Sequence, residues 1–353
     1  MRVWIDFLTP KQLNFTSVLS RQIRVAGHDL LLTTRNYREI GKLVEARGME
    51  AKKLGEFGGS SLYGKLEASV DRFEALLREV QEHRPDISFS FGSPEASRIS
   101  FGLGIPHFCI IDSPHAEAVC RLTLPLSRGI FTPKVIPIAS WRKYGVNADK
   151  ITRYDALDPV VWMRELKPDI SFINQLNLKT DGIILVFRLE EQFASYLLSA
   201  DRNSVVIRIL EELLPNIRKD IQIVALPRYD AQVKSLTSFE NRIIVPKEPI
   251  DGFSLLSYSS IFVGAGGTMT AESALMGVPT ISCYPGRSTF VEQYLVRNKL
   301  VNRITNASKT VKTILKMIDH LDDLRTSQKE RAHRMIERME DPVKVIMRST
   351  GLL

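Results

Sequence analysis

A glycine-rich turn between an apolar run and a helix-like run carries the clearest chemical signal in this sequence. Residues 261–285 read IFVGAGGTMTAESALMGVPTISCYP. Gly264, Gly266 and Gly267 remove side chains where the helix is expected to begin, so its free N–H groups and positive dipole end could approach a diphosphate. A glycine turn can also be a purely structural connection between a strand and a helix.

Four side chains could complete an anion and ribose site around this turn. Thr268 could cap the helix and offer a hydroxyl to phosphate, and Glu272 could reach the diol of a ribose. Arg188 and Arg228 each follow an apolar run, and arginine forms strong paired hydrogen bonds with phosphate. Either arginine could instead be a surface ion-pair partner.

Three polar residues follow the next expected strand. Arg287, Glu292 and Gln293 could contact the hydroxyls of a sugar. Glu292 and Gln293 could equally lie on the surface of a helix.

A second group of titratable residues follows the apolar run 107–111. His115 or Asp112 could deprotonate a hydroxyl, with Glu117 orienting the histidine, and we favour His115 as the base. Alternatively, Asp112 caps a helix and Glu117 interacts with its dipole. Asp6, at the end of the first expected strand, could be catalytic or purely structural.

Other polar residues are expected in loops on the acceptor side of the site. Gln12 and Asn14 follow the first expected strand, Gly58 and Gly59 precede Ser60 and Ser61, and Ser93 precedes a short helix. The glycines permit close approach of the backbone and the serines add donors, so the loop 56–64 could bind phosphate or acceptor, or could be an ordinary connection.

The sequence gives no indication of a metal or a cofactor. It has no His, Cys and Asp cluster with metal-ligand spacing, and the Asp-x-Asp, Gly-x-Ser-x-Gly and Walker lysine motifs are absent. Cys109, Cys120 and Cys283 stand singly in apolar surroundings, so we interpret them as small buried residues of a protein from a reducing compartment.

Composition and charge narrow the range of partners. The chain is 44% hydrophobic and 25% charged, as in ordinary globular proteins, and carries a net charge of +8. From residue 297 onward, 13 Lys and Arg stand against 7 Asp and Glu, an excess of 6 positive charges. This region could be a solvated helical face or could contact an anionic membrane. Aromatic and basic residues do not alternate, so we expect no nucleic acid partner.

Strand-like runs alternate with helix-like runs, which indicates an α/β fold of parallel sheets. We expect two Rossmann-like domains facing a central cleft, at 1–165 and 166–325, with a helical tail at 326–353. No run of residues approaches 18 consecutive apolar positions, so we expect a cytoplasmic protein, with peripheral membrane contact as an alternative. The expected strands are 3–8, 29–34, 87–91, 107–111, 129–131, 151–153, 182–187, 221–226, 241–245, 261–263 and 280–284. The expected helices are 14–26, 38–47, 65–83, 93–103, 204–214, 252–257 and 268–276.

The motifs in both halves resemble those of known proteins. The segment 261–285 is similar to the nucleotide-binding segment of GT-B glycosyltransferases, especially the one that adds N-acetylglucosamine to the lipid-linked peptidoglycan precursor, and of non-hydrolysing nucleotide-sugar 2-epimerases. Residues 85–97 and 104–112 show the superfamily's order of strand, glycine turn, helix, Gly-Ile-Pro and strand. The chain most resembles an uncharacterised, mainly archaeal domain of unknown function, which shares Gly-Ser-Pro-Glu-Ala, His-Ala-Glu-Ala at 115–118, Leu-Thr-Leu-Pro-Leu and Gly-Gly-Thr-Met.

The resemblance implies a metal-independent glycosyltransferase with a uridine-diphosphate sugar as donor and a sugar or lipid-linked acceptor. It places the donor in the second domain and the acceptor in the first. A 2-epimerase is the first alternative, although Thr270 and Ala271 stand where epimerases carry paired acids, and Gly286 begins the loop that replaces their Arg-Pro-Glu. A non-catalytic nucleotide-sugar-binding protein is the second, because Gln12 and Asn14 occupy a loop that carries a histidine in many relatives.

Overall fold

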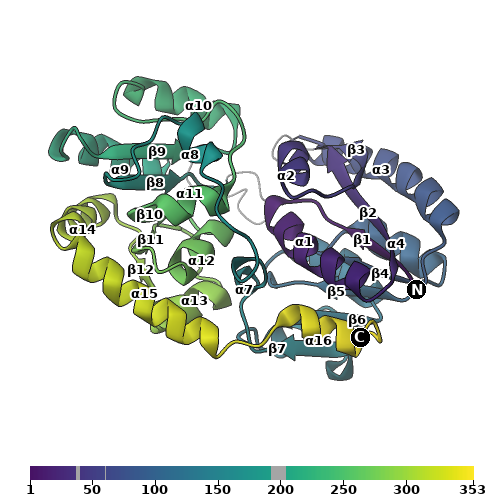
Figure 1. The fold of residues 1–353 in the computed structure, drawn as a ribbon. Coiled ribbons are helices and arrows are strands. Elements are labelled where there is room, and N and C mark those ends of the chain that lie inside the picture. Colours follow the sequence, from purple (N-terminus) through teal and green to yellow (C-terminus); the bar gives the residue numbers. More distant parts are fainter. Residues whose placement is uncertain (37–39, 60, 192–203) are drawn as a thin grey trace. The chain divides into compact units, whose positions relative to one another are not determined.

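The computed structural model describes residues 1–36, 40–59, 61–191 and 204–353, which form two compact units. The first unit comprises Met1–Glu165 and Met339–Leu353, and the second comprises Leu166–Arg338. Arg38, where we expected a helix to begin, and Ser60 lie outside the described residues. Both units are parallel-sheet α/β structures, so the predicted fold class is confirmed (Figure 1).

The first unit is built on a seven-stranded parallel sheet with the order β3-β2-β1-β4-β5-β6-β7. Its strands are β1 (Arg2–Asp6), β2 (Asp29–Asn36), β3 (Lys52–Glu56), β4 (Ile87–Ser90), β5 (His107–Ile110), β6 (Gly129–Pro133) and β7 (Ile151–Tyr154). Its helices are α1 (Pro10–Val25), α2 (Ile40–Ala46), α3 (Leu62–His83), α4 (Pro94–Gly102), α5 (Glu117–Thr123), α6 (Ala139–Arg142), α7 (Pro159–Met163) and α16 (Pro342–Ser349).

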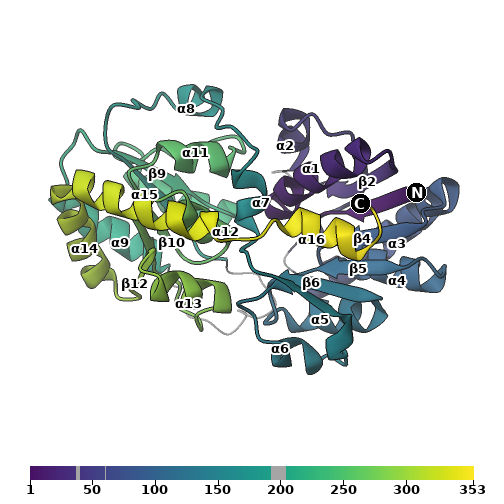
Figure 2. The same cartoon turned by 60° about the horizontal axis from the view of Figure 1, so that its bottom comes forward.

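The central strands of this sheet are apolar and buried on both faces. Val3, Trp4 and Ile5 of β1 have no exposed surface, as expected for a strand covered by helices on either side. Near the C-terminus, α16 returns to this unit and packs against α1 (Figure 2). His28 bonds the backbone carbonyl of Leu352, which ties the end of the chain to the turn after α1.

The second unit is built on a five-stranded parallel sheet with the order β12-β11-β10-β8-β9. Its strands are β8 (Ile184–Arg188), β9 (Gln222–Leu226), β10 (Ile261–Gly264), β11 (Thr280–Ser282) and β12 (Val301–Arg303). Its helices are α8 (Ser171–Gln175), α9 (Val205–Leu213), α10 (Asp230–Leu236), α11 (Gly252–Tyr258), α12 (Thr268–Leu275), α13 (Phe290–Arg297), α14 (Ala307–Asp319) and α15 (Leu321–Glu337).

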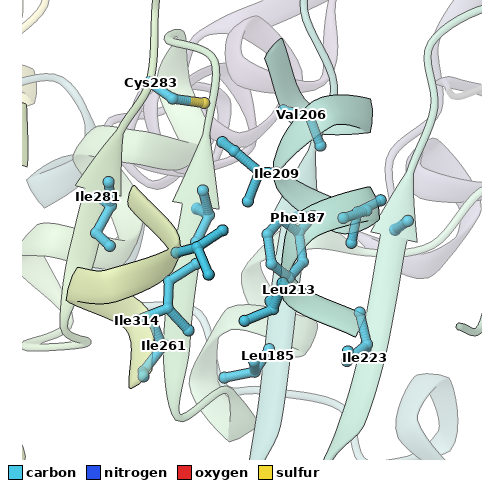
Figure 3. Close-up of a cluster of buried hydrophobic side chains, with 14 of the residues drawn as sticks. Leu185, Phe187, Val206, Ile209, Leu213, Ile223, Ile261, Ile281, Cys283 and Ile314 are labelled. Carbon is cyan, nitrogen blue, oxygen red and sulfur yellow. The ribbon is translucent and has the colours of Figure 1, made fainter. Parts of the chain in front are cut away.

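One face of this sheet packs on α9 and α14. Phe187 of β8, Ile209 of α9 and Ile314 of α14 meet in a fully buried cluster (Figure 3). This packing fixes the strands, and so the positions of the loops at their carboxyl ends.

The three cysteines are free and buried, as predicted, and burial raises the pKa of Cys109 to about 12.

Several helices and strands were predicted wrongly or missed. Instead of a strand at 241–245 there is one isolated bridge, between Ile244 and Val224. Strand β3 and helices α5 to α8 were not expected, and α3 begins at Leu62, where Ser61 caps it, rather than at residue 65. Within the described ranges, every helix is too short or too polar to cross a membrane.

Candidate functional site

The glycine turn of the second unit lies at the carboxyl edge of its sheet. Gly264 ends β10 and pairs in register with Arg188, which ends the neighbouring strand β8. The next strand outward, β9, ends at Leu226, two residues before Arg228. Parallel strands place their carboxyl ends at one edge, so both arginines and the turn are brought to the edge where open α/β sheets bind ligands.

The backbone of the turn requires glycine. Gly266 and Gly267 have φ angles of 86° and 90°, and the ψ of −171° at Gly267 puts it in a region that other residues essentially do not adopt. A Cβ on Gly266 would lie 3.0 Å from the ring of Tyr284, and one on Gly264 would lie 2.5 Å from the ring of Phe262. The turn is therefore closely packed on the protein side.

Helix α12 begins directly after this turn. Gly267 occupies its N-cap position, so the expectation that Thr268 caps the helix was wrong. Thr268 is the first helical residue because Gly267 already adopts the non-helical cap conformation. Among the described residues, no side chain caps the first backbone N–H groups of α12, as an anion-binding helix end requires.

The guanidinium of Arg228 lies beside this helix end. Its Nη2 atom is 3.5 Å from the point that a Cβ on Gly267 would occupy. Arg228 donates from Nε to the carbonyl of Leu189, at 3.2 Å, and its Nη1 lies 3.8 Å from Glu191. The backbone N–H of Arg228 donates to Gln232, which fixes the loop. Gln232 was not predicted as a site residue.

Arg188 is directed along the same sheet edge. Its Nη1 atom donates to the carbonyl of Pro227 at 3.1 Å. Both arginines that were predicted to bind diphosphate are thus positioned by backbone carbonyls of neighbouring strand ends.

Two residues inside α12 face the protein interior. Glu272, the predicted ribose ligand, is only 4% exposed. Thr270 is 3% exposed, and its hydroxyl lies 2.9 Å from the position that a Cβ on Gly264 would occupy. This hydroxyl has no hydrogen-bond partner in the part of the chain that the structure describes. Thr270 was not predicted as a binding residue, although its hydroxyl lies next to the glycine turn.

Two of the predicted sugar-binding residues after β11 take part in hydrogen bonds and an ion pair within the second unit. Glu292 is buried, accepts a hydrogen bond from Ser282 and lies 3.5 Å from Nε of Arg303. Gln293 donates to the carbonyl of Ser288 at 3.0 Å. Arg287 is exposed. Glu292 and Gln293 therefore order the loop in which Arg287 lies.

In the first unit, a lysine joins two carboxylates at the carboxyl edge of the sheet. The ammonium of Lys11 lies 2.5 Å from Oδ2 of Asp112 and 2.7 Å from Oδ2 of Asp158. Ser113 donates to Oδ1 of Asp112 at 2.8 Å, and Tyr154 donates to Oδ1 of Asp158 at 2.6 Å. We call these five residues the Lys11 cluster.

The two carboxylates of the cluster have opposite pKa shifts. Burial acts to raise the pKa of Asp112, but the charge and hydrogen bond of Lys11 outweigh it and the pKa is lowered. Burial raises the pKa of Asp158, and Lys11 offsets this only in part while the charge of Asp112 adds to it. Burial also opposes the charged form of Lys11, but the two carboxylates together raise its pKa.

Of this cluster, only Asp112 was predicted as a site residue. Lys11 is the second residue of α1, where a cation is unfavourable because it faces the positive end of the helix dipole. A lysine at that position needs nearby carboxylates. The position of Lys11 at the start of a helix therefore indicated that acidic side chains lie close to it. Asp158 and Tyr154 gave no such signal, because neither lies in a motif of the sequence and both are far from Lys11 along the chain.

His115 and Glu117, the other predicted catalytic residues, lie on the same side of the first unit. His115 is exposed at the surface, and partial desolvation of its ring lowers its pKa. Glu117 is the first residue of α5, and its carboxylate pairs with Arg121 at 2.8 Å, one turn along the helix.

The residues predicted to contact an acceptor are held by protein groups. Gln12 accepts from the N–H of Leu8 and donates to the carbonyl of Phe91. Asn14 is buried and accepts from Arg47. Ser93 caps α4.

The glycines of the expected acceptor loop differ from each other. Gly58 packs so closely on the start of α3 that a Cβ would lie 2.4 Å from the carbonyl oxygen of Gly64. Gly59 has a φ of 70° and open space around it.

Asp6 is part of a buried ion-pair network. Its Oδ1 accepts from the hydroxyl of Thr33 at 2.7 Å and lies 2.6 Å from Nη2 of Arg72. The other terminal nitrogen of Arg72, Nη1, lies 3.6 Å from Oε2 of Glu95. Among the residues that the structure describes, no group of three or more His, Cys, Asp or Glu side chains could hold a metal ion.

Comparison with known proteins identifies the family to which this chain is related. Residues 1–350 match a family described as "Protein of unknown function (DUF354)", which confirms the resemblance to a domain of unknown function. An uncharacterised protein of Methanocaldococcus jannaschii, MJ0665, is 31% identical over an alignment of 305 residues, which covers 83% of this chain and 85% of that protein.

Solved structures of the GT-B fold are similar over nearly the whole chain. A putative UDP-N-acetylglucosamine 2-epimerase from Listeria monocytogenes has a TM-score of 0.75 at 14% identity, with 99% of this chain and 96% of that chain covered. The UDP-GlcNAc 2-epimerase from Neisseria meningitidis bound to UDP-GlcNAc has a TM-score of 0.73 at 15% identity, with 99% and 100% covered. The spinosyn rhamnosyltransferase SpnG has a TM-score of 0.63 at 14% identity, with 99% and 100% covered. These likenesses show the fold.

Proposed function

The chain belongs to the DUF354 family of proteins of unknown function, and we propose that it binds a nucleoside-diphosphate sugar at the glycine turn of the second unit and transfers the sugar to an acceptor hydroxyl. The observation that carries this proposal is the position of Arg228 beside Gly267 at the uncapped start of α12.

A diphosphate fits this arrangement chemically. The first N–H groups of α12 and the positive end of its dipole attract an anion, and Arg228 adds a full positive charge with several donors. Arg188 adds a second guanidinium at the same edge, held 3.1 Å from the carbonyl of Pro227. Thr270 could add a hydroxyl on the interior side of the turn.

Transfer requires a base for the acceptor and stabilisation of the leaving group. As the acceptor oxygen attacks the anomeric carbon, its proton passes to the base and the bond to the diphosphate breaks with its electron pair on the diphosphate. Arg228 and the start of α12 would stabilise the negative charge that grows there, which lowers the barrier. His115 and Asp112 of the first unit are the candidate bases.

Epimerisation at C2 of the sugar is a second candidate. It needs one group that removes a proton and another that returns one. The Lys11 cluster offers a carboxylate with a lowered pKa beside one with a raised pKa, which suits these two tasks. Several solved structures of similar fold are UDP-GlcNAc 2-epimerases.

Incubation with single nucleotide sugars tests both candidates. The purified protein is mixed with each UDP-sugar in deuterated water, binding is followed by thermal shift, and products are identified by mass spectrometry. Transfer predicts slow release of UDP, which becomes faster when a suitable acceptor is added. Epimerisation predicts a sugar isomer with one deuterium and no release of UDP. Binding without either product would indicate a non-catalytic protein, and the absence of binding to any nucleotide sugar would refute the proposal.

A further inference from the structure

The Lys11 cluster contains one cation for two carboxylates, of which Asp158 is buried and Asp112 is partly exposed. We propose that Asp158 is a positioning residue that acts on Asp112 through Lys11: protonation of Asp158 decides how far the Lys11 ammonium is available to hold Asp112 as a carboxylate base. The proposal rests on the proposed function, because it concerns the base that receives the acceptor proton.

The geometry makes the two carboxylates compete for one ammonium. Lys11 lies 2.5 Å from Asp112 and 2.7 Å from Asp158, so it contacts both at once. With both carboxylates ionised the three groups carry one excess negative charge, and in a poorly solvated position like charges raise each other's proton affinity. One proton on either carboxylate restores a balanced pair with Lys11.

Burial decides which carboxylate takes that proton. The side chain of Asp158 is 2% exposed, whereas that of Asp112 is 24% exposed. Water therefore stabilises the charge of Asp112 but not that of Asp158, because the cost of desolvation falls on the charged form. The proton is expected on Asp158, in agreement with its raised pKa.

Tyr154 allows Asp158 to exchange a proton without losing its hydrogen bond. A tyrosine hydroxyl can donate to a carboxylate and can accept from a carboxylic acid, whereas a lysine ammonium can only donate. Oδ1 of Asp158 faces Tyr154 at 2.6 Å and Oδ2 faces Lys11. The proton therefore belongs on Oδ1, which leaves the contact with Lys11 in place.

The other charged groups around the cluster act mainly on Asp112. His115, three residues beyond Asp112, lowers the pKa of that carboxyl when it is charged, and Lys143 acts on His115. Asp158 is affected by Lys11 of α1, by Asp112 after β5 and by Tyr154 of β7. Asp158 and the partly exposed Asp112 thus interact through the ammonium that they share and by direct repulsion of their charges.

Two substitutions should move the titration of Asp158 in opposite directions. Asp112→Asn removes the competing carboxylate, so Lys11 serves Asp158 alone and the pKa of Asp158 falls. Lys11→Met removes the ammonium, and the pKa of Asp158 rises. Each shift should be about one pH unit or more. A purely structural role for either residue would not give shifts of opposite sign.

The titration can be read without any turnover. Proteins labelled with ¹³C at the aspartate carboxyls are titrated by NMR, with Asp158 assigned through Asp158→Asn. The acid limb of the pH profile of turnover, once a substrate is known, should move to higher pH in Lys11→Met. Asp155→Asn is the matched control, because Asp155 lies one residue beyond Tyr154 but is half-exposed and pairs with Lys134.

If Lys11→Met does not fold, Tyr154→Phe tests the same relationship. Loss of the tyrosine donor destabilises the Asp158 carboxylate, so Asp158 keeps its proton to higher pH and its pKa should rise as it does in Lys11→Met. Shifts of the same sign in Asp112→Asn and Lys11→Met, or an unchanged Asp158 in Asp112→Asn, would overturn the proposal. Failure of the proposed function would instead appear as absent turnover with the NMR shifts intact.

Discussion

Nη2 of Arg228 lies 3.5 Å from the position that a Cβ would occupy on Gly267. The two residues come from different strand ends of the second unit, and their meeting combines a guanidinium with the start of α12. A side chain on Gly267 would occupy the space between them, so the absence of one keeps the helix end open to a ligand.

Substitution of Gly267 by alanine should therefore weaken nucleotide binding. The φ of 90° and ψ of −171° are strained for any residue with a Cβ, and the new methyl group would stand between Arg228 and the first N–H groups of α12. We expect the affinity for UDP, measured by isothermal titration calorimetry, to fall about tenfold or more, which corresponds to roughly 1.4 kcal/mol.

Gly104→Ala controls for backbone strain alone. Gly104 has a φ of 69° with open space around it, and it lies in the first unit. It should lower stability without changing UDP affinity. Equal loss of affinity in both variants would mean that Gly267 has no local role in binding.

The sequence predicted the second unit's site better than the first unit's. The glycine turn combines an apolar strand, three glycines and a helix within a few residues, so its geometry follows from local sequence. The Lys11 cluster depends on residues from three distant segments, and nothing local to Asp158 indicates that it meets Lys11.

The fold was predicted where strands are buried and missed where they are exposed. β1 and β10 read as apolar runs because helices cover both of their faces. β3 is an edge strand with the sequence KKLGE and no buried residue, so it carries no apolar pattern. Conversely, Ile243 to Val245 is apolar but only Ile244 is bridged to the sheet, because burial by other contacts also favours apolar residues.

His107 should make the first unit sensitive to acid. It is 1% exposed among the hydroxyls of Ser88, Ser90 and Ser97, and burial lowers its pKa to about 4. In the unfolded chain this histidine binds a proton near pH 6.5, whereas in the folded chain it stays neutral down to about pH 4. The free energy of unfolding therefore has its full value above pH 6.5 and decreases as the pH falls towards 4. We expect a loss of about 2 kcal/mol between pH 7 and pH 5.

Urea unfolding at several pH values measures this effect. His107→Gln should show a flatter dependence of the unfolding free energy on pH than the wild type. His333→Gln, at an exposed histidine paired with Glu337, should leave the dependence unchanged. Identical slopes for His107→Gln and the wild type would contradict the assignment.

Arg72 should be essential to the stability of the first unit. It is 3% exposed and pairs at 2.6 Å with Asp6, which has no exposed surface. Arg72→Met leaves the Asp6 carboxylate buried without its cation, which should cost about 3–5 kcal/mol in a denaturation experiment. Asp6→Asn combined with Arg72→Met should restore part of that loss.

Arg78→Met provides the comparison on the same helix. Arg78 forms an exposed ion pair with Glu74, one turn away, and such pairs contribute little. Its loss should not measurably change stability. If Arg72→Met were equally harmless, Asp6 would have to be uncharged in the folded protein.

Calorimetric titration of UDP into the wild type, Arg228→Ala and Arg218→Ala measures whether the glycine turn and Arg228 bind a nucleoside diphosphate, as we propose. Arg218 is an exposed arginine of the same unit, paired with Asp220, and serves as the matched control. We expect binding by the wild type and Arg218→Ala, and an affinity about ten- to hundredfold weaker in Arg228→Ala because a charged hydrogen-bond donor is lost. Equal affinities in all three proteins, or no binding of UDP by the wild type, would contradict the proposal.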